Sequence, residues 1–454
     1  MLSIVTADSS SGAVGAEARH AHLTPIEAIM WRAGHDETLR MTVGTLLVLD
    51  RAPSADQLVE RLSAAACRAP RLQRRPGDRP STWANPPWVG ETGFDGHGHV
   101  RVLSAGAPGG RRQLLDLLTL VEAAPFEPGR SPWDVTVVEG VADGTAALYL
   151  RAHHVLTDGI GGTSLIGAVL DANGSRPTPD EPSAGRRRLD VTGVAAAVRD
   201  MAAAMNDDPV GTVLGSFQRA LDTAGSVARQ LLVPGSSLSS LPPSRSTTSR
   251  FDTISVPGAR PAALALGGSR NDLLVAAAGL ALDAYQHRLG LPGSDFRVAT
   301  PASRHRDGTS GGNWFAPTRL ELPRPGPSPA AYFGIVAERL ARARREPAVA
   351  LAPSIAAAVS RLPDQLLLAA LKGQAATVDF AATAFPGLRG PRTIGTAVIE
   401  QSYPFGPRLG RALNLTAFGH GDRLDVGIAL DRVAISEPEV FLDCLSEAFD
   451  RLAR

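Results

Sequence analysis

Several stretches of the chain carry the apolar pattern of buried strands. The clearest runs are Met41–Val48, Trp133–Val138, Ala146–Ala152 and Arg297–Thr300. Short runs of this kind, bounded by turn residues, are typical of strands packed inside a sheet. The pattern therefore predicts a strand at each of the four.

Helix starts are marked by local capping signals. Thr24-Pro25-Ile26-Glu27 combines a threonine cap, a proline at the first helical position and a glutamate three residues after the cap, which together form a capping box. Ser54–Gln57 and Ser436–Glu439 repeat this arrangement before apolar segments. A longer apolar helix is predicted from a cap at Asn271 to a stop near Gly290. Helices and strands alternate along the chain, which predicts an α/β fold.

The length predicts two domains, because a single core rarely serves more than about 250 to 300 residues and this chain has 454. Residues 1–21 are small and polar and are expected to form a flexible tail. Asp171–Arg187 is rich in Pro, Gly, Ser and charge, as linkers are. We therefore expect an N-terminal domain over 22–170, a linker over 171–187 and a C-terminal domain over 188–454.

Composition excludes several classes of function. The formal net charge is +1, with 46 basic against 45 acidic side chains, so no overall field favours a nucleic-acid partner. Lys372 is the only lysine, which leaves little room for a lysine nucleophile. Cys67 and Cys444 stand alone, so the sequence indicates neither a metal site nor a disulfide framework.

Targeting signals are also missing from the sequence pattern. The N-terminal segment lacks the basic and long apolar regions of a signal peptide. No apolar run approaches the roughly 20 residues that a membrane-spanning helix needs. We expect a cytoplasmic protein, and peripheral contact with a membrane or a lipid droplet stays open.

The candidate chemistry lies in the run from His153 to Gly159, at the end of a predicted strand. Side chains alternate along a strand, so His154 is expected to share a face with Leu150 and Ala152, and His153 the other face with Arg151. An imidazole titrates near neutrality, so His154 is a candidate general base.

Asp158 and Gly159 follow the strand. Asp158 is expected to pair with an arginine or with a ring nitrogen and so to hold the turn, and Gly159 leaves room for a close approach of the backbone. A bare pair of adjacent histidines is more often an ordinary core or surface feature, so the weight of the motif comes from the complete pattern His-His-x-x-x-Asp-Gly.

This pattern resembles the signature of the coenzyme A-dependent acyltransferase superfamily, which includes the condensation domains of peptide synthetases. Within it, the chain looks most like the bacterial wax ester synthase/diacylglycerol acyltransferase family. The resemblance extends from about Leu23 to the C-terminus. Its further motifs are Leu23–Glu27, Arg130–Trp133 (a Pro-Leu-Trp motif without the leucine), Asn271-Asp272, Gly311-Gly312-Asn313, Gln401–Pro404, Leu413–Leu415 and Gly427–Asp431.

The resemblance implies two chloramphenicol-acetyltransferase-like α/β domains with the active site in a channel between them. It places Trp133, Asn271 and Asn313 on the substrate side. For Asn271, helix capping and contact with the thioester or the acceptor are equally good interpretations. It also implies that Gln401–Pro404 and Leu413–Leu415 belong to the sheet of the C-terminal domain.

The chain departs from the family at Ala384–Leu388, where the family usually has Asn-Val-Pro-Gly-Pro. The acceptor side of the channel is therefore expected to differ. Trp83, Trp88 and Trp314 are candidates for the lining of an acyl tunnel, although packing is the commoner role of tryptophan. Gly308–Gly312 matches Gly-x-Ser-x-Gly but lacks the strand and helix that flank a nucleophile elbow.

The sequence thus predicts an O-acyltransferase. It would move a fatty acyl group from acyl-CoA to a long-chain alcohol or diacylglycerol, with no cofactor beyond acyl-CoA as co-substrate and no metal. Two alternatives remain. One is a tailoring acyltransferase that modifies a specialised metabolite with a donor bound to CoA or to a carrier protein, and the other is a catalytically silent lipid-binding module.

Overall fold

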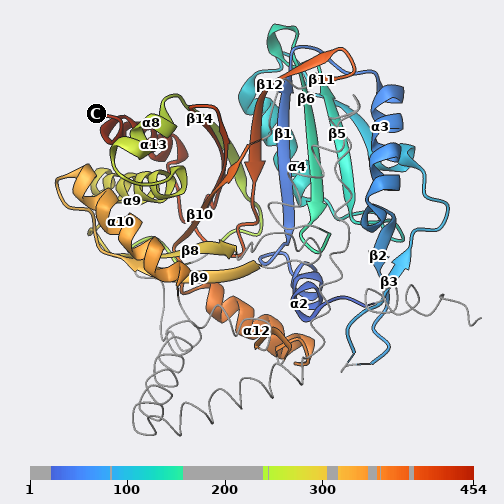
Figure 1. The fold of residues 1–454 in the computed structure, drawn as a ribbon, viewed down its shortest axis with the longest axis horizontal. Helices are drawn as coiled ribbons and strands as arrows, with labels where there is room; N and C mark the ends of the chain where they lie inside the picture. The colour runs from blue at the N-terminus through green and yellow to red at the C-terminus, as the bar shows by residue number, and fades with distance from the viewer. Residues whose placement is uncertain are drawn as a thin grey trace, which may run out of the picture.

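The computed structural model describes residues 22–81, 84–156, 239–243, 245–303, 315–345, 355–357, 359–387 and 393–454. Two six-stranded sheets stand side by side (Figure 1). The predicted linker at 171–187 and the tail at 1–21 lie outside these residues, so both stay predictions.

The first sheet has the strand order β11-β12-β1-β6-β5-β4. Its strands are β1 (Thr42–Leu49), β4 (Val100–Ser104), β5 (Trp133–Glu139), β6 (Ala146–His153), β11 (Thr393–Ile394) and β12 (Ala397–Phe405). Helix α3 (Ala55–Arg68) packs on one face and helix α4 (Arg111–Ala123) on the other. The strands predicted at 41–48, 133–138 and 146–152 are confirmed within one or two residues at each end.

The second sheet has the strand order β7-β14-β13-β10-β8-β9. Its strands are β7 (Arg250–Val256), β8 (Phe296–Ser303), β9 (Phe315–Leu322), β10 (Phe380–Pro386), β13 (Leu413–His420) and β14 (Arg423–Leu430). Helices α8 (Ala259–Ala265), α9 (Arg270–Arg288), α10 (Pro329–Arg344) and α13 (Pro438–Leu452) gather on one side of it (Figure 1). Helix α9 is buried from Asp272 to Leu282, so it forms the centre of this core.

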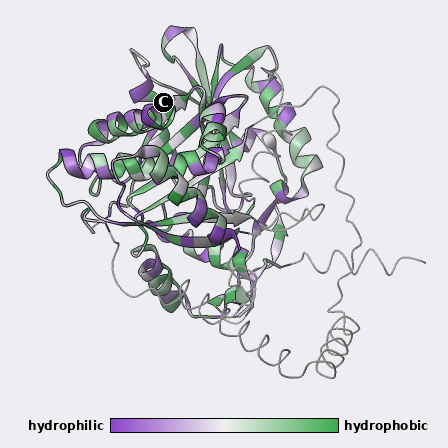
Figure 2. Cartoon of the chain, turned by 60° about the vertical axis from the view of Figure 1, so that its left-hand side comes forward, coloured by the Kyte–Doolittle hydropathy of each residue, from purple (hydrophilic) through white to green (hydrophobic). Residues whose placement is uncertain are grey.

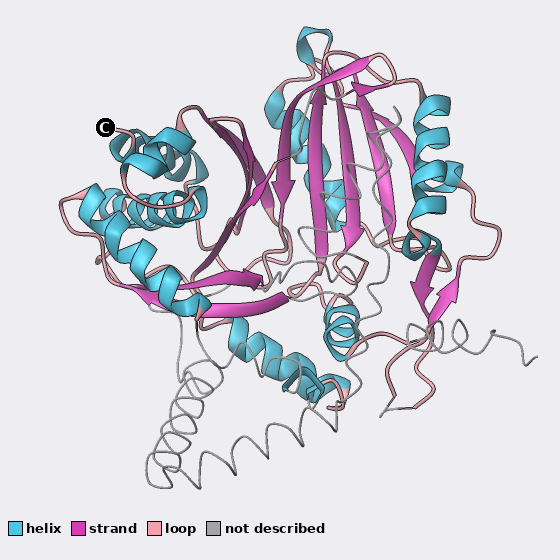
Figure 3. Ribbon diagram, in the orientation of Figure 1, coloured by secondary structure: helices cyan, strands magenta, loops and turns pink. Residues whose placement is uncertain are grey.

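Shorter elements complete the described part of the chain. They are α2 (Pro25–Ala33), α12 (Asp364–Ala375), the two-stranded sheet β2 (Arg74–Pro76) and β3 (Trp88–Gly90), and the single turns η2 (Pro70–Gln73), η3 (Gly96–His99) and η4 (Ala142–Gly144). Figure 3 shows α2 and α12 together below the ends of the first sheet's strands. In Figure 2 the helices carry both hydrophilic and hydrophobic segments, as expected for helices with one buried face.

Strand β12 joins the half of the molecule that contains the first sheet to the half that contains the second sheet. Its position corrects the expectation that Gln401–Pro404 belongs to the C-terminal sheet. Gln401–Pro404 lies on β12, which pairs with β1 in the first sheet and not with the C-terminal sheet. Strand β12 also packs against β13 and β14. Without β12, β1 would present an open edge of unpaired backbone groups. The expected C-terminal domain over 188–454 therefore supplies two strands, β11 and β12, to the N-terminal sheet.

The predicted helix starts are confirmed, but only one of the three capping boxes forms. Thr24 accepts from the backbone of Glu27, and the Glu27 carboxylate accepts from the backbone of Thr24 at 2.8 Å. Ser54 precedes α3 without a side-chain cap bond. The residue that caps α13 is Glu437, not Ser436, and it also forms no such bond.

Candidate active site

The two histidines lie where β6 ends. Strand β6 runs between β1 and β5, and His153 is opposite Thr42 on β1. The backbone N–H of His153 donates to Pro132 at 2.8 Å, and that of His154 donates to Met41 at 2.6 Å. The neighbouring chain segments on both sides therefore fix the backbone of the pair.

His153 is packed as a neutral residue. It is 5% exposed, and its Nδ1 accepts the N–H of Val155 at 3.1 Å. A proton therefore resides on Nε2, which is enclosed and has no hydrogen-bond partner among the described residues. Burial, with smaller contributions from His154 and His35, lowers the pKa of His153 to about 3. Such a group stays uncharged at neutral pH and cannot readily accept a proton.

Aromatic contacts confirm which face of the sheet His153 occupies. Its ring meets Trp31 at 5.0 Å and Phe126 at 6.5 Å between centroids, and the Arg151 guanidinium also lies over Phe126, at 4.6 Å. His153 and Arg151 therefore share a face, as the alternation predicted. Gly34 lies so close to the His153 ring that a methyl group at this position would overlap it.

His154 is the first residue of the turn after β6, and 7% of its surface is exposed. The next predicted site residues, Asp158 and Gly159, lie outside the described residues, and so does the helix predicted after them. Their roles stay predictions.

An ion pair that the sequence did not reveal supports the end of β6. Arg151 is 2% exposed and donates to both carboxylate oxygens of Asp134 at 2.7 to 3.0 Å. It also donates to the carbonyls of Val121 and Ala124. Since one partner is on β6 and the other on β5, this pair fixes the strand that carries the histidines.

Asn271 does not cap helix α9. Ser269 is the cap, and it forms a capping box with Asp272. The Asn271 side-chain oxygen instead accepts the N–H of Ala384 at 3.0 Å. Asn271 therefore joins the start of α9 to the segment in which the chain departs from the family pattern. Its amide nitrogen is the atom that could donate to a substrate carbonyl.

Trp133 lies in the core of the first half. It is 5% exposed, its indole N–H donates to the carbonyl of Leu72 at 2.8 Å, and its ring stacks on His99 at 4.0 Å. This placement favours packing over the expected contact with substrate. Trp88 is 8% exposed and packs in the same core. Asn313, Trp83 and Trp314 lie outside the described residues.

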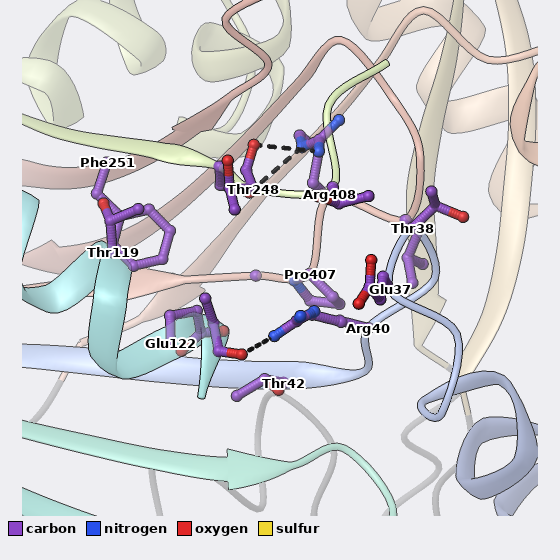
Figure 4. A pocket seen from close by; sticks show the side chains of 15 residues that line it. Glu37, Thr38, Arg40, Thr42, Thr119, Glu122, Thr248, Phe251, Pro407 and Arg408 are labelled. Carbon is purple, nitrogen blue, oxygen red and sulfur yellow. Dashed lines mark hydrogen bonds between the residues drawn. The ribbon is translucent and has the colours of Figure 1, made fainter. Parts of the chain in front are cut away.

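A polar cavity between the two halves was not foreseen. It has a volume of about 40 Å³, room for about three water molecules. Its walls come from residues before and at the start of β1, the end of α4, the segment that leads into β7 and the loop after β12 (Figure 4). Thr42 lines it, and Thr42 is the strand partner of His153. The cavity thus adjoins the strand pair that ends at the histidines.

Charged and hydroxyl groups dominate the lining, and Glu122 is one of its titratable groups. The Tyr149 hydroxyl donates to one Glu122 oxygen at 2.7 Å. Burial raises the pKa of Glu122, although this bond and the charge of Arg151 act in the opposite direction. No sequence motif marks this site, since its walls are far apart in the chain.

Comparison with known proteins agrees with this fold. The model of the wax ester synthase/diacylglycerol acyltransferase catalytic domain matches residues 23–274, and that of the C-terminal domain of the same family matches residues 311–453. A protein of Mycobacterium tuberculosis (strain ATCC 25618 / H37Rv), named for diacylglycerol O-acyltransferase activity, is 30% identical over 453 residues, with 95% of this chain and 91% of the relative covered.

Solved structures show the same architecture. A wax ester synthase/diacylglycerol acyltransferase from Marinobacter aquaeolei VT8 is 21% identical with a TM-score of 0.61, covering 95% of this chain and 98% of the other. A starter condensation domain of rhizomide synthetase, solved with C8-CoA, is 14% identical with a TM-score of 0.59, covering 98% and 96%.

The fold is the two-domain architecture related to chloramphenicol acetyltransferase, and the family models and the relative from Mycobacterium tuberculosis identify an acyltransferase. The chain belongs to the wax ester synthase/diacylglycerol acyltransferase family. Among the described helices, none combines the length and the apolar character needed to cross a bilayer.

Proposed function

We propose that this acyltransferase moves a fatty acyl group from acyl-CoA to the hydroxyl of a long-chain alcohol or a diacylglycerol, with His154 as general base. The observation that carries the proposal is the difference between the two histidines. His153 is held neutral by burial, with Nδ1 already bonded to the backbone. The base of the motif is then His154, in the turn that follows the strand.

The donor and the acceptors are supported by the names and bound ligands of similar proteins. The rhizomide synthetase domain of similar fold was solved with C8-CoA, which supports an acyl-CoA donor. The names of the relatives support an alcohol or a diacylglycerol as acceptor.

The proposed reaction is a direct transfer. The acceptor oxygen attacks the thioester carbonyl while His154 takes the hydroxyl proton, and the resulting imidazolium returns that proton to the departing CoA thiolate. The C–O bond forms, the C–S bond breaks, and the products are an ester and free CoA. No covalent acyl-enzyme and no cofactor are required.

Two asparagines are proposed to support this step. The oxygen of Asn271 is already bonded to Ala384, which orients its amide nitrogen, and this nitrogen would donate to the thioester carbonyl. Asn313 is proposed as a second substrate contact, and this role rests on the family resemblance alone. Asp158 and Gly159 would shape the turn around His154.

The test is the variant His154→Ala. General-base catalysis is typically worth about 10² to 10⁴-fold in rate, so thiol release from acyl-CoA in the presence of an alcohol should fall by at least about 100-fold. The circular dichroism spectrum and the melting temperature should stay close to those of the wild type. Unchanged turnover would remove His154 from its role.

A tailoring acyltransferase with a polar acceptor is the second candidate. It is favoured by the altered segment that begins at Ala384 and by the polar lining of the cavity beside β1. A screen of long-chain alcohols, diacylglycerol and polar hydroxyl or amine acceptors separates the two. Exclusive use of a polar metabolite-like acceptor would favour the second candidate.

A further inference from the structure

One buried arginine lacks a counter-charge among the residues that the structure describes. Arg411 lies just before β13, and 9% of its surface is exposed. Its guanidinium forms no hydrogen bond or ion pair with any described residue. The Nε atom is enclosed, whereas the two Nη nitrogens are not among the enclosed atoms. Arginines this deeply buried are almost always paired, so Arg411 has donors available to a ligand.

The two carboxylates that flank this loop are already engaged. The residue after Arg411, Ala412, donates to the carbonyl of Asp379, and its own carbonyl accepts the N–H of Asp431. The Asp379 carboxylate accepts two backbone N–H groups, and the Asp431 carboxylate pairs with Arg408. Neither carboxylate is therefore left to pair with Arg411.

A second guanidinium reaches the same place. Arg319 on β9 donates to the side-chain oxygen of Gln374 on α12. The next residue of this helix, Ala375, lies beside Gly410, where a Cβ would be 3.7 Å from the Cβ of Ala375. Gly410 directly precedes Arg411. The two arginines therefore meet beside this end of α12, although they come from different strands of the second sheet.

The charges of these two groups reinforce each other. Burial, and to a smaller extent the charge of Arg319, lowers the pKa of Arg411 to about 10. Burial and the charge of Arg297 lower the pKa of Arg319 to about 10 as well. Both guanidiniums still carry their charge at neutral pH. An anion bound between them would relieve their repulsion and offset the cost of burying Arg411.

The proposed reaction offers one substrate with such a charge. Long-chain alcohols, diacylglycerol and the ester product are uncharged, whereas acyl-CoA carries phosphate groups. A guanidinium presents several N–H donors in a planar fork that matches the oxygens of a phosphate. Among the proposed substrates, the donor is therefore the one that fits two adjacent arginines.

The packing around α12 relates this place to the motif. Ala375 belongs to a small apolar cluster with Ala33 and Leu39, and Met41 packs against it. The carbonyl of Met41 accepts the backbone N–H of His154 at 2.6 Å. The pantetheine arm of CoA separates its phosphates from the thioester, so a phosphate held beside Ala375 does not have to touch His154.

We propose that Arg411, together with Arg319, binds a phosphate group of the acyl-CoA donor. The proposal rests on the proposed function for the identity of the donor, and it names the residues that hold the part of the donor remote from the reacting carbonyl.

The experiment compares octanoyl-CoA with S-octanoyl-pantetheine, which has the same thioester and no phosphate, as donors to dodecan-1-ol. In Arg411→Met, KM for octanoyl-CoA should rise by at least about 10-fold with kcat within about two-fold, because a hydrogen bond to a charged group is worth roughly that factor. The kcat/KM for S-octanoyl-pantetheine should change far less, within about two-fold. An equal loss with both donors would show a purely structural role and overturn the proposal.

Arg432→Met is the matched control, because it removes an exposed arginine from the same half of the chain. Its KM for octanoyl-CoA should stay at the wild-type value. Without any ligand, Arg411→Met should melt at or above the wild-type temperature, since methionine keeps the apolar stem and removes a buried charge without a partner. A melting temperature several degrees lower would mean that the protein itself pairs this guanidinium, which contradicts the proposal.

Binding separates this proposal from the proposed function. Titration calorimetry on His154→Ala protein needs no turnover, and there Arg411→Met should weaken the binding of octanoyl-CoA by at least about 10-fold. Undiminished binding would refute the phosphate site even if His154 is the base. If the wild type transfers no acyl group from octanoyl-CoA, the proposed function fails, while the calorimetry still decides the site.

Inorganic phosphate distinguishes the two sources of this group. It should bind to the wild type at least about 10-fold more weakly than octanoyl-CoA, because it lacks the contacts of the rest of the donor. If inorganic phosphate binds as tightly as octanoyl-CoA and loses this binding in Arg411→Met, the site belongs to free phosphate, and the link to the donor is overturned.

Discussion

At the scale of single residues, two adjacent histidines in one motif have different environments. Burial against Trp31 and Phe126 and the bond from Val155 hold His153 uncharged. His154, one residue further, has left the strand. These sequence neighbours therefore differ in structural environment, because the last strand residue points into the packed side of the sheet. The structure assigns His153 to the support of the motif.

The pKa of His153 makes the stability depend on pH. Its folded pKa of about 3 lies below the ordinary histidine pKa of 6.5, so between these values the unfolded chain binds the proton more readily. The stabilisation is complete above about pH 6.5 and is lost as the pH falls toward 3. In chemical denaturation, the contribution of His153 to the free energy of unfolding should be about 2 kcal/mol smaller at pH 5 than at pH 7.

The variant His153→Asn, which cannot titrate, should lose this part of the pH dependence. His35→Asn is the control, since His35 is an exposed histidine close to the motif. This variant should retain the wild-type dependence of the unfolding free energy on pH. A slope that is the same in all three proteins would show that His153 carries its proton in the folded state.

At the scale of elements, the crossing of β12 brings strands from the two sheets into close backbone contact. A methyl group added at Gly427 on β14 would overlap the carbonyl of Pro404 on β12. The absence of a side chain here lets the two strands approach, and the approach places the loop after β12 against the polar cavity. Strand pairing alone would not require glycine at position 427, since the residue paired with it on β7, Thr253, carries a side chain.

Gly427→Ala should therefore destabilise the fold by about 1 to 3 kcal/mol, the usual cost of overpacking a core. Gly334→Ala is the matched control, because Gly334 lies in α10 with open space around it. There, alanine should stabilise the helix by about 0.5 to 1 kcal/mol. Denaturant unfolding of both variants tests the contact. An unchanged free energy of unfolding in Gly427→Ala would mean that β12 and β14 can move apart enough to accommodate the added methyl group.

At the scale of the whole molecule, two contacts join the half that contains the first sheet to the half that contains the second sheet. Strand β12 closes the edge of the first sheet, and helix α12 packs under α2. Arg32 on α2 carries much of the second contact. It is 8% exposed and donates to Asp364 at 2.5 Å and to the carbonyls of Ser360 and Leu362 at 2.7 and 2.5 Å. Since α2 also contacts His153, this contact supports the motif.

Removal of the Arg32 side chain should weaken the contact between α2 and α12. Arg32→Ala leaves two carbonyls without their charged donor, at a cost of about 2 to 3 kcal/mol. Amide hydrogen exchange should rise in α12 and α2 before it rises in the sheets. Arg51→Ala, which removes an arginine from an exposed pair with Asp50, should leave stability and exchange close to the wild type. Equal exchange in α12 of both variants would contradict the assignment.

The candidate site could be predicted only in part. The position of the histidines at a strand end and the face of His153 follow from a period-two pattern, so they were predictable. The pair Arg151–Asp134 joins β6 to β5, and the cavity draws its walls from four distant segments. Trp133 matched a family motif, yet its stacking on His99 places it in the core. These features depend on which surfaces meet, and no local pattern encodes that.

The sequence by itself determined the strands, the helix starts and the capping box at Thr24, because each depends on residues within a few positions of one another. It also determined the family, through motifs spread along the chain. Only the tertiary structure decided that β12 completes the first sheet, that Ser269 and not Asn271 caps α9, and that Glu122 meets Thr42 in a cavity. Strand pairing and interdomain packing are set by contacts between residues far apart in the chain, and their free energy exists only once the chain has folded.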